Sequence, residues 1–566
     1  MACYSLKLIW IALALGVQVS ALPGLSKAST QADRSPSPPV ATLKSNHART
    51  ETIFVGRSLP EFDQEVFLGI KYADKPVRFT PSTLKIAYST NDSDSGAYMA
   101  STNDLGISHR AVLYNATEYG YECPGYGSDE TKLVDMGLIQ LNEDCLNLNI
   151  IRPKPQSSET QLLPVMLWIF GGGWQQGATA DPRYNMSYIV HQGALNNKPV
   201  LGVSINYRVA AFGLLDSKEI RASGDNNLAL RDQRMAMRWV KQNIHAFGGD
   251  PDKVTIWGES AGAYSVGAHL VANDGNNEGL FRAAIMESGN ANGPPWNGTE
   301  WHQPMYNRIV AKAGCSSSPD TLQCLRDVSY ETIYNAAYEG LEWFGAIDGT
   351  FIKTFPQISI TQGKMAKVPI LLGTNTDEGT SFGTTGTNTD EECIEQLISS
   401  KRWVINREQA AKLLTFYPND PALGCPYGWG NTTWPNLGLM YKRYESMAGD
   451  LTMVGPRRLL AQNMADTIGV GHFAEIPFVF ANPVQNITAL GDDPNRLELG
   501  NLAARMWTSF IVDLDPNGHN VANIPRWPQY SQEASNFVFR LPRDSSYTEV
   551  DNYRAEGINY INSIPR

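Results

Sequence analysis

The stretch Thr255–Ser265, TIWGESAGAYS, places Ser260 between two glycines directly after a short β-branched run. The pattern G-x-S-x-G is weak evidence by itself, because chance produces it in about one chain of this length in three. A nucleophile elbow is more specific, since it needs a strand that leads into the serine and a helix that leaves it. Residues 253–257 are typical of a buried strand and residues 261–272 of a helix, which predicts that Ser260 is a nucleophile.

Small residues occupy the positions where such a turn brings two backbones together. Gly258, Ala261 and Gly262 leave the space that a tight strand-to-helix turn requires. The alternative interpretation is an ordinary strand–loop–helix junction in which Ser260 only caps the helix. The rest of the chain bears on this choice, because a catalytic serine needs a base, an acid and oxyanion donors.

Length and composition indicate a large globular protein. The chain has 566 residues, 42% of them hydrophobic and 10% aromatic, so it can bury a large core. Its formal net charge is -11, and no basic cluster occurs along it. The composition therefore argues against nucleic acid and against anionic membranes as partners.

The first fifty residues predict export. An apolar run, Leu8–Val19, is followed by the small-x-small sequence of residues 19–21, which is typical of a signal peptide over residues 1–21. Residues 22–50 are rich in Ser, Pro, Ala and Thr and predict a disordered leader. We expect residues 51–566 to form one continuous catalytic domain. No later stretch approaches twenty apolar residues, so we predict a secreted protein without an integral membrane segment.

Cysteines and sequons agree with an oxidising compartment. Cys3 falls in the signal peptide, and the other six cysteines form an even set suited to disulfides: Cys123, Cys145, Cys315, Cys324, Cys393 and Cys425. None belongs to a C-x-x-C motif, which disfavours a zinc or redox site. Six sequons predict glycosylation: Asn91, Asn115, Asn185, Asn297, Asn431 and Asn486.

The middle of the chain alternates apolar strands with helical stretches. The expected strands are Val165–Phe170, Val200–Asn206, Val254–Trp257, Ala283–Glu287 and Val368–Gly373. Between the second and third, Leu228, Met235 and Trp239 recur at helical spacing. Strands and helices that alternate in this way predict an α/β fold with a mostly parallel central sheet and helices on both faces.

A glycine run after the first of these strands predicts an oxyanion hole. In WIFGGGWQQG, residues 168–177, the run Gly171–Gly173 gives a backbone that can approach a substrate and point N–H groups at it. Two nucleotide motifs fail here, because Ala178 stands where a P-loop needs lysine and Gln176 breaks the G-x-G-x-x-G spacing. A structural glycine turn is the alternative interpretation.

The acid and the base must follow Ser260 in the order acid, then histidine. LLGTNTDEGTSF follows a buried strand and offers Asp377 and Glu378. His472, in GVGHFAEIPFVF, is preferred over His519, which lies in the polar turn DPNGHN. His269 is excluded, because nine helical residues separate it from Ser260 by roughly 13 Å along the axis. A core histidine bound to backbone is the alternative for His472.

Several motifs in a fixed order resemble the type-B carboxylesterase/lipase family, which includes fungal lipases, liver carboxylesterases and cholinesterases. The motifs are FLGIKYADKPVRF, EDCLNLNI, FGGGW, INYRVAAFGLL, DQRMAMRWVKQNIHAFGGDPDKVTIWGESAG and FRAAIMESG. The resemblance extends over nearly everything from about residue 60 onward and implies the α/β-hydrolase fold.

The resemblance also implies roles for single residues. It matches Ser260 to the nucleophile, Glu378 to the acid, His472 to the base, and Gly172, Gly173 and the N–H of Ala261 to the oxyanion donors. The choice of Glu378 over Asp377 depends on this match alone. No metal or organic cofactor is required by the mechanism that it implies.

Ion pairs and disulfides are further implications of the resemblance. It implies the ion pairs Arg78–Glu143 and Arg208–Asp232 and the disulfides Cys123–Cys145 and Cys315–Cys324. Cys393 and Cys425 would then pair by elimination.

One segment departs from the family. Its members usually place a further strand and a long loop between the helix matched by Arg457–Met464 and the catalytic histidine, but here only Ala465–Gly471 intervene. Either the edge of the sheet is rebuilt, or the sequence comes from a gene model that lost an exon.

The expected function is hydrolysis of carboxylic esters through an acyl-enzyme, with a small-molecule or lipid ester as substrate. A true triacylglycerol lipase in transient contact with a lipid surface is the alternative, and a catalytically silent binding protein is disfavoured because the triad residues are present. The family places its flap inside the first disulfide loop, which here holds only 21 residues, 124–144. Only Leu133, Val134, Met136, Leu138 and Ile139 could make its apolar face, which favours an esterase.

Overall fold

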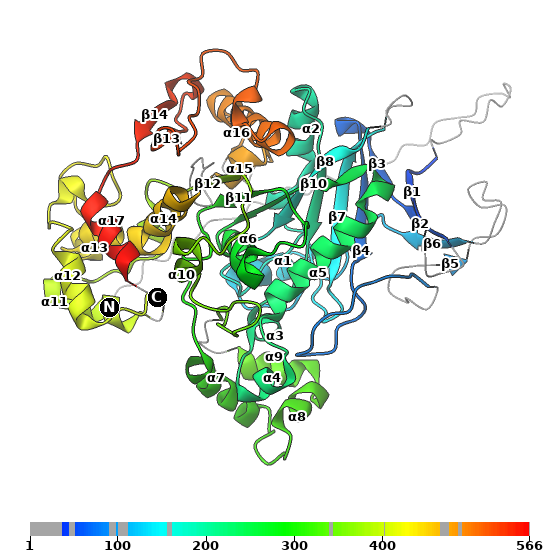
Figure 1. The fold of residues 1–566 in the computed structure, drawn as a ribbon, viewed down its shortest axis with the longest axis horizontal. Helices are drawn as coiled ribbons and strands as arrows, with labels where there is room; N and C mark the ends of the chain where they lie inside the picture. The colour runs from blue at the N-terminus through cyan, green and yellow to red at the C-terminus, as the bar shows by residue number, and fades with distance from the viewer. Residues whose placement is uncertain are drawn as a thin grey trace, which may run out of the picture. The chain divides into compact units, whose positions relative to one another are not determined.

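An eight-stranded sheet forms the centre of the chain (Figure 1). The structure is a computed structural model that describes residues 37–44, 51–89, 98–99, 111–155, 161–338, 343–400, 402–464, 475–484 and 490–564. Contacts divide the chain into a unit of residues 1–37 and a unit of residues 38–566, and the description below concerns the second unit. From one edge to the other, the strands are β12 (Ile370–Gly373), β11 (Ala283–Glu287), β10 (Gly249–Glu259), β8 (Leu163–Ile169), β9 (Leu201–Ile205), β7 (Asn147–Pro153), β4 (Gln64–Lys71) and β3 (Arg57–Leu59).

The pairing pattern confirms the predicted fold class. The strands from β12 to β9 are parallel to one another, and β7, β4 and β3 pair antiparallel at the other end. All five predicted strands form, and together they make the parallel part. Their residues are buried almost throughout, which is typical of parallel strands covered on both faces.

Helices cover both faces of this sheet (Figure 1). The helices of the described residues are α1 (Ser128–Asp135), α2 (Ser187–Leu195), α3 (Ala210–Leu214), α4 (Lys218–Ser223), α5 (Leu228–Asn243), α6 (Ala261–Val271), α7 (Thr299–Lys312), α8 (Thr321–Asp327), α9 (Tyr330–Ala337), α10 (Pro356–Thr361), α11 (Asp390–Ser399), α12 (Arg407–Leu414), α13 (Tyr441–Gly449), α14 (Gly455–Asn463), α15 (Ile476–Val479), α16 (Pro494–Asp513) and α17 (Ala555–Ser563). Helices α5 and α6 pack on one face of the sheet, and α2 and α16 pack together on the other. Leu228 and Trp239 of α5 are buried as their spacing predicts, whereas Met235 is half-buried.

The prediction of a disordered leader over residues 22–50 is wrong near its C-terminal end. Val40–Leu43 lies inside residues 22–50, yet it forms strand β1, which pairs antiparallel with β2 (Glu51–Val55). Ala41 and Leu43 are buried while Val40 is exposed, so the segment has the alternation of an edge strand. With β6 (Ala111–Asn115) and β5 (Tyr98–Met99) these strands make a second sheet in the order β1-β2-β6-β5. Residues 1–36 and 45–50 lie outside the described residues.

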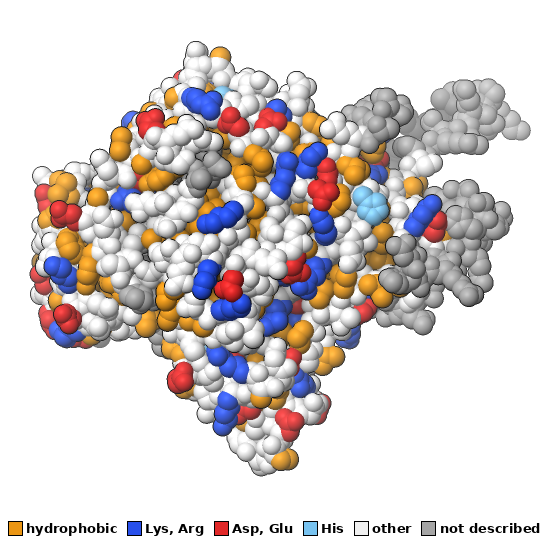
Figure 2. Space-filling view, in the orientation of Figure 1, with side chains coloured by type: hydrophobic (Ala, Val, Ile, Leu, Met, Phe, Trp, Pro, Cys, Tyr) orange, Lys and Arg blue, Asp and Glu red, His pale blue; other side chains and the backbone are white. Residues whose placement is uncertain are grey.

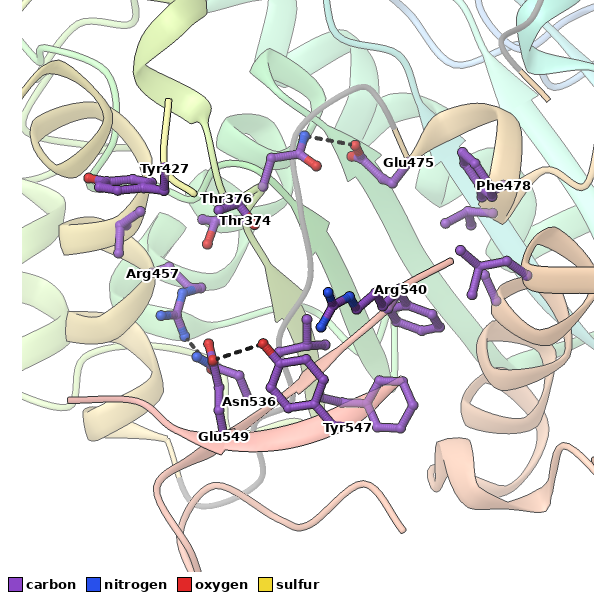
Figure 3. A pocket seen from close by; sticks show the side chains of 18 of the residues that line it. Thr374, Thr376, Tyr427, Arg457, Glu475, Phe478, Asn536, Arg540, Tyr547 and Glu549 are labelled. Carbon is purple, nitrogen blue, oxygen red and sulfur yellow. Dashed lines mark hydrogen bonds between the residues drawn. The ribbon is translucent and has the colours of Figure 1, made fainter. Parts of the chain in front are cut away.

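The sheet ends at β12 on the side where the sequence departs from the family. Within the described residues, β12 pairs only with β11, and β13 (Ser535–Val538) and β14 (Tyr547–Val550) pair only with each other. A cavity of about 570 Å³ lies between residues 374–376, which follow β12, and these two strands (Figure 3).

Two of the three implied disulfides form. Cys123–Cys145 and Cys315–Cys324 are bridged, but Cys393 and Cys425 are separate buried thiols, so their pairing by elimination is wrong. Cys393 packs on α11 in an apolar cluster shared with α12, α13 and α17, where burial raises the pKa of its thiol to about 11. The Cys425 thiol instead lies 3.7 Å from the carboxylate of Asp377.

Both implied ion pairs are present in bidentate geometry. Arg78 donates two hydrogen bonds of 2.7 Å to Glu143, and Arg208 donates to both oxygens of Asp232 at 2.6 and 2.7 Å. On the face seen in Figure 2, basic and acidic side chains are interspersed. Among the described residues, no helix combines the length and apolarity that a membrane span requires.

Candidate active site

Ser260 lies on the turn between β10 and α6, at the carboxyl end of a central strand. Its φ of 54° is a conformation that L-residues rarely adopt, and such strain is common at functional sites. Two backbone hydrogen bonds hold the turn: the Ser260 N–H donates to Glu287 O at 2.9 Å, and the Tyr264 N–H donates to Ser260 O at 2.8 Å. The neighbouring strand β11 therefore fixes the position of Ser260.

The small residues of the motif are required by packing. A Cβ on Gly262 would lie 2.0 Å from Ile169 O, and a Cβ on Gly258 would lie 2.5 Å from the carbonyl carbon of Gly262. Helix α6 can start directly behind the strand only because both side chains are absent. The turn thus has the backbone geometry expected of a nucleophile elbow.

The glycine run after β8 faces this turn. A Cβ on Gly171 would lie 3.0 Å from the Cβ of Ser260, and Gly172 and Gly173 have φ values of +88° and +67°. The Gly172 carbonyl accepts the N–H groups of Gln175 and Gln176, which closes the loop. In the described part of the chain, no acceptor takes the N–H of Gly172, Gly173 or Ala261. These three donors are therefore available to a substrate oxygen.

The two adjacent carboxyl groups after β12 point to different partners. Glu378 is buried, and its Oε1 accepts the Ser288 hydroxyl at 2.8 Å and the Asn375 N–H at 2.7 Å. Asp377 accepts the Tyr427 N–H at 2.8 Å, on the far side of the loop. Ser288 directly follows Glu287, the residue that anchors Ser260. Glu378 is thus the carboxyl group that binds to the strand on which Ser260 is anchored.

His472 lies outside the described residues, in the segment 465–474. The two histidines set aside on sequence grounds, His269 and His519, are among the described residues. His269 is fully buried on α6 with Nε2 at 3.0 Å from Gln233 Oε1, and burial holds its pKa well below the usual range. His519 accepts the N–H of Val521 through Nδ1. Among the described residues, no histidine is hydrogen-bonded to Ser260 or Glu378, so the position of the base stays a prediction.

A cavity of about 220 Å³ opens beside Ser260. Residues of four segments line it: Asp129, Glu130 and Leu133 of α1; Gly171, Gly172, Gln176 and Gly177 of the glycine loop; Asp181, Arg183 and Tyr184 after that loop; and Glu259 and Ser260 of the turn. Ligand pockets usually measure about 300–1,000 Å³, so this one is small. Because α1 forms one wall, the disulfide loop that carries α1 limits the space for an acyl chain.

Comparison with known proteins agrees with this geometry. The sequence model of the Carboxylesterase family matches residues 108–465. The chain belongs to the carboxylesterase family.

Relatives of this carboxylesterase-family chain include fungal lipases. It is 32% identical to "Lipase 2" of Diutina rugosa, over 93% of this chain and 96% of that protein. It is 36% identical to "Secreted lipase 1" of Botryotinia fuckeliana, over 75% and 77% of the two chains. A solved structure of Aspergillus niger EstA superimposes with a TM-score of 0.76 at 26% identity, over 93% of this chain and 98% of the other. The family membership makes this chain a carboxylic-ester hydrolase.

The first disulfide loop of this carboxylesterase carries the expected flap. Leu133 and Ile139 are buried against Ala178, whereas Val134, Met136 and Leu138 are 40%, 57% and 45% exposed. Only three of the five apolar residues therefore face outward.

Polar bonds hold the flap against the glycine loop. Gln176 Oε1 accepts the N–H groups of Asp129 and Glu130 at 3.1 Å each. Glu130 accepts the Gly125 N–H at 3.0 Å, and burial raises the pKa of its carboxyl to about 8. This flap is short and well anchored.

Sequence reasoning missed three buried carboxyl groups near Ser260 and Glu378: Glu259, Glu287 and Glu475. Glu475 lies at the wall of the cavity in Figure 3, where Asn375 Nδ2 donates to it at 3.3 Å. A signal was present, because Glu259 and Glu287 are charged residues that directly follow the mainly apolar runs of residues 254–258 and 283–286. Lys and Glu are almost never fully buried without a partner, so such positions point to a site.

Proposed function

We propose that this carboxylesterase cleaves its substrates in two steps, with Ser260 as nucleophile, His472 as base and Glu378 as the acid that orients the base. In the first step Ser260 Oγ attacks the ester carbonyl while His472 takes its proton. Glu378 stabilises the imidazolium, and the N–H groups of Gly172, Gly173 and Ala261 bind the oxyanion. The C–O bond of the ester then breaks, and His472 gives its proton to the leaving alcohol. Water, activated by His472, attacks the acyl-enzyme and releases the carboxylic acid and free Ser260.

One observation carries this proposal: the strained Ser260 turn lies against a glycine loop in which the N–H groups of Gly172 and Gly173 have no acceptor in the described residues. Buried backbone donors are nearly always hydrogen-bonded, so donors left open beside a serine suit a transient oxyanion. The Ser288–Glu378 hydrogen bond adds support, because it joins the acid to the strand that anchors Ser260.

Substitution of the serine tests the proposal. Ser260→Ala should fold with an unchanged melting temperature and should lose about 10³-fold or more of its activity on nitrophenyl acetate and butyrate. Ser223→Ala, which removes the hydroxyl of an exposed serine at the end of α4, is the control and should keep the rate within about twofold. A purified Ser260→Ala protein with most of the parent rate would refute the assignment.

We further propose that an esterase with modest acyl chains describes this protein better than a lipase. The small cavity and the anchored flap support this choice. A lipase is the second candidate, because relatives are named lipases and three apolar side chains of the flap are exposed.

Substrate aggregation separates these two candidates. A surface-activated lipase gains rate when its substrate passes from monomer to droplet, because the surface has higher affinity for the open flap. We expect saturation with dissolved tributyrin, no jump across its solubility limit, and slow triolein turnover. A sharp rise at emulsification together with fast triolein turnover would assign a lipase instead.

We infer that the protein is secreted. Relatives from Botryotinia fuckeliana and Gibberella zeae are named as secreted lipases, and residues 1–21 have the pattern of a signal peptide. Of the four described sequon asparagines, Asn115 and Asn431 are exposed, and these two are the best candidates for glycosylation. Asn91 and Asn486 lie outside the described residues.

A further inference from the structure

Two buried carboxyl groups lie side by side behind the nucleophile. Glu259 on β10 and Glu287 on β11 are direct partners in the parallel register, so both side chains point to the same face of the sheet. Neighbouring strands are about 4.8 Å apart, and Glu259 and Glu287 are 0% and 1% exposed. Two like charges at this distance, away from water, would repel strongly.

Two tryptophans hold one of these groups. The indole N–H of Trp257 and the indole N–H of Trp507 both donate to Oε1 of Glu287, each at 2.6 Å. Trp257 lies two residues before Glu259 on the same face of β10, and Trp507 comes from α16, which covers that face. Oε1 is therefore fully occupied as an acceptor. The carboxyl group of Glu287 has one defined orientation.

The other oxygen of Glu287 has no such donor. Within the described residues, the buried Glu287 Oε2 has no hydrogen-bond partner, and the same is true of Oε1 of the neighbouring Glu475. A buried anionic oxygen without a hydrogen-bond donor raises the free energy of the folded state. A carboxylic acid fits better, because its O–H can donate to an adjacent carboxylate while its carbonyl oxygen accepts both indoles.

The charged groups around Glu287 are all acidic in the described residues. Glu259 faces it from β10, Glu475 lies next to it at the start of α15, and Glu378, in the loop after β12, is a further acidic neighbour of Glu475. Burial raises the pKa of Glu287 to about 8, although the two indoles oppose the shift. Burial also raises the pKa of Glu475 well above its usual range, and the charges of Glu287, Glu259 and Glu378 add to this effect.

We propose that Glu287 is a positioning residue of the ester-hydrolysis site: it works as a neutral carboxylic acid, fixed by Trp257 and Trp507, that separates the acidic neighbours and leaves the negative charge of the triad on Glu378. The inference rests on the roles proposed above for Ser260 and Glu378. It assigns no contact between Glu287 and the substrate.

Glu287 is connected to both halves of the catalytic machinery. Its carbonyl oxygen accepts the Ser260 N–H at 2.9 Å, and the next residue, Ser288, donates to Glu378 at 2.8 Å. A charge on the Glu287 side chain would push Glu259 and Glu475 away and strain this junction. Loss of the Glu287 proton therefore disturbs the nucleophile and the acid together.

The sign of the pH effect follows from this arrangement. Glu287 keeps its proton below a pH of about 8 and loses it above, so the parent activity should fall on the alkaline side. Glu287→Gln keeps the shape and the neutral charge but cannot ionise. It should match the parent kcat/KM at pH 6–7 and retain about tenfold more of its neutral-pH activity at pH 9.5.

A second variant tests the role of the indoles. Trp507→Phe removes a donor that stabilises the ionised form, so the alkaline fall should move to higher pH. Glu391→Gln, which removes an exposed carboxylate on α11, is the matched control and should keep the parent profile. The proposal would be overturned if the pH–activity profiles of Glu287→Gln and Trp507→Phe both superimpose on the parent profile up to pH 9.5. An equal loss for Glu287→Gln at every pH would do the same.

Infrared difference spectroscopy separates this inference from the proposed function. The parent minus Glu287→Gln spectrum at pH 7 should show a protonated-carboxyl stretching band, and its absence would overturn the proposal whatever the activity. If Glu287→Gln does not fold, the proposal is tested by the pH–activity profile of Trp507→Phe and by an infrared pH titration of the parent. Ester hydrolysis that persists in Ser260→Ala would instead refute the proposed function. The protonated-carboxyl band would still show whether Glu287 is neutral.

Discussion

The nucleophile region and the acid region of this site are built in different ways. Ser260 follows a strand with neighbours on both sides, and its turn is held by β11 and by packing that excludes side chains at Gly258 and Gly262. Glu378 follows β12, the last strand of the sheet in the described residues, and the hydrogen bond to Ser288 spans 90 positions of sequence. The nucleophile thus depends on local backbone geometry, whereas the acid depends on long-range contacts at an edge.

The acid region makes the largest testable difference between neighbouring residues. Glu378→Gln should lower kcat about 10³-fold or more, because His472 loses the charge that orients it and stabilises its imidazolium. Asp377→Asn should keep the rate within about fivefold, since Asp377 binds only the loop of Tyr427. Kinetics of both variants on nitrophenyl butyrate measure this contrast. Equal losses would mean that the two carboxyl groups have been assigned in the wrong order.

The glycine loop should show a smaller effect that is confined to the chemical step. A Cβ on Gly172 would lie 2.4 Å from Gln176 O at a φ of +88°, so Gly172→Ala must move the proposed oxyanion donor. Loss of one such donor lowers kcat about 10²-fold or more with little change in KM. Gly137→Ala in the flap, also at positive φ but in open space, is the matched control and should leave kcat within about twofold. Similar losses in both variants would indicate general strain instead.

The same contrast explains what could be predicted from the sequence. The elbow, the five parallel strands and the glycine loop could be predicted, because apolar runs and small residues at tight turns report on contacts between near neighbours in sequence. Glu378 could not be separated from Asp377 by spacing, since the choice depends on Ser288, a partner on another strand. The structure supplies that partner.

The incorrect sequence predictions concern positions whose structure depends on contacts between residues far apart in the chain. Residues 40–43 read as leader because a Ser/Pro-rich stretch precedes them, yet they form a strand that pairs with β2. Cys393 and Cys425 looked like a pair by count, yet each is buried in its own surroundings. The buried position of Glu287 depends on an indole from α16, 220 residues away. Motif reading cannot detect such an assembly.

Covalent labelling of the nucleophile tests the central claim most directly. A phosphorylating organophosphate mimics the acyl-enzyme step, so it should modify the parent with a stoichiometry of one and inactivate it in proportion. Mass spectrometry of the peptide that contains Thr255–Ser265 should locate the adduct on Ser260, and Ser260→Ala should remain unmodified. An adduct on another residue, or a folded and active enzyme that takes up no label, would contradict the account.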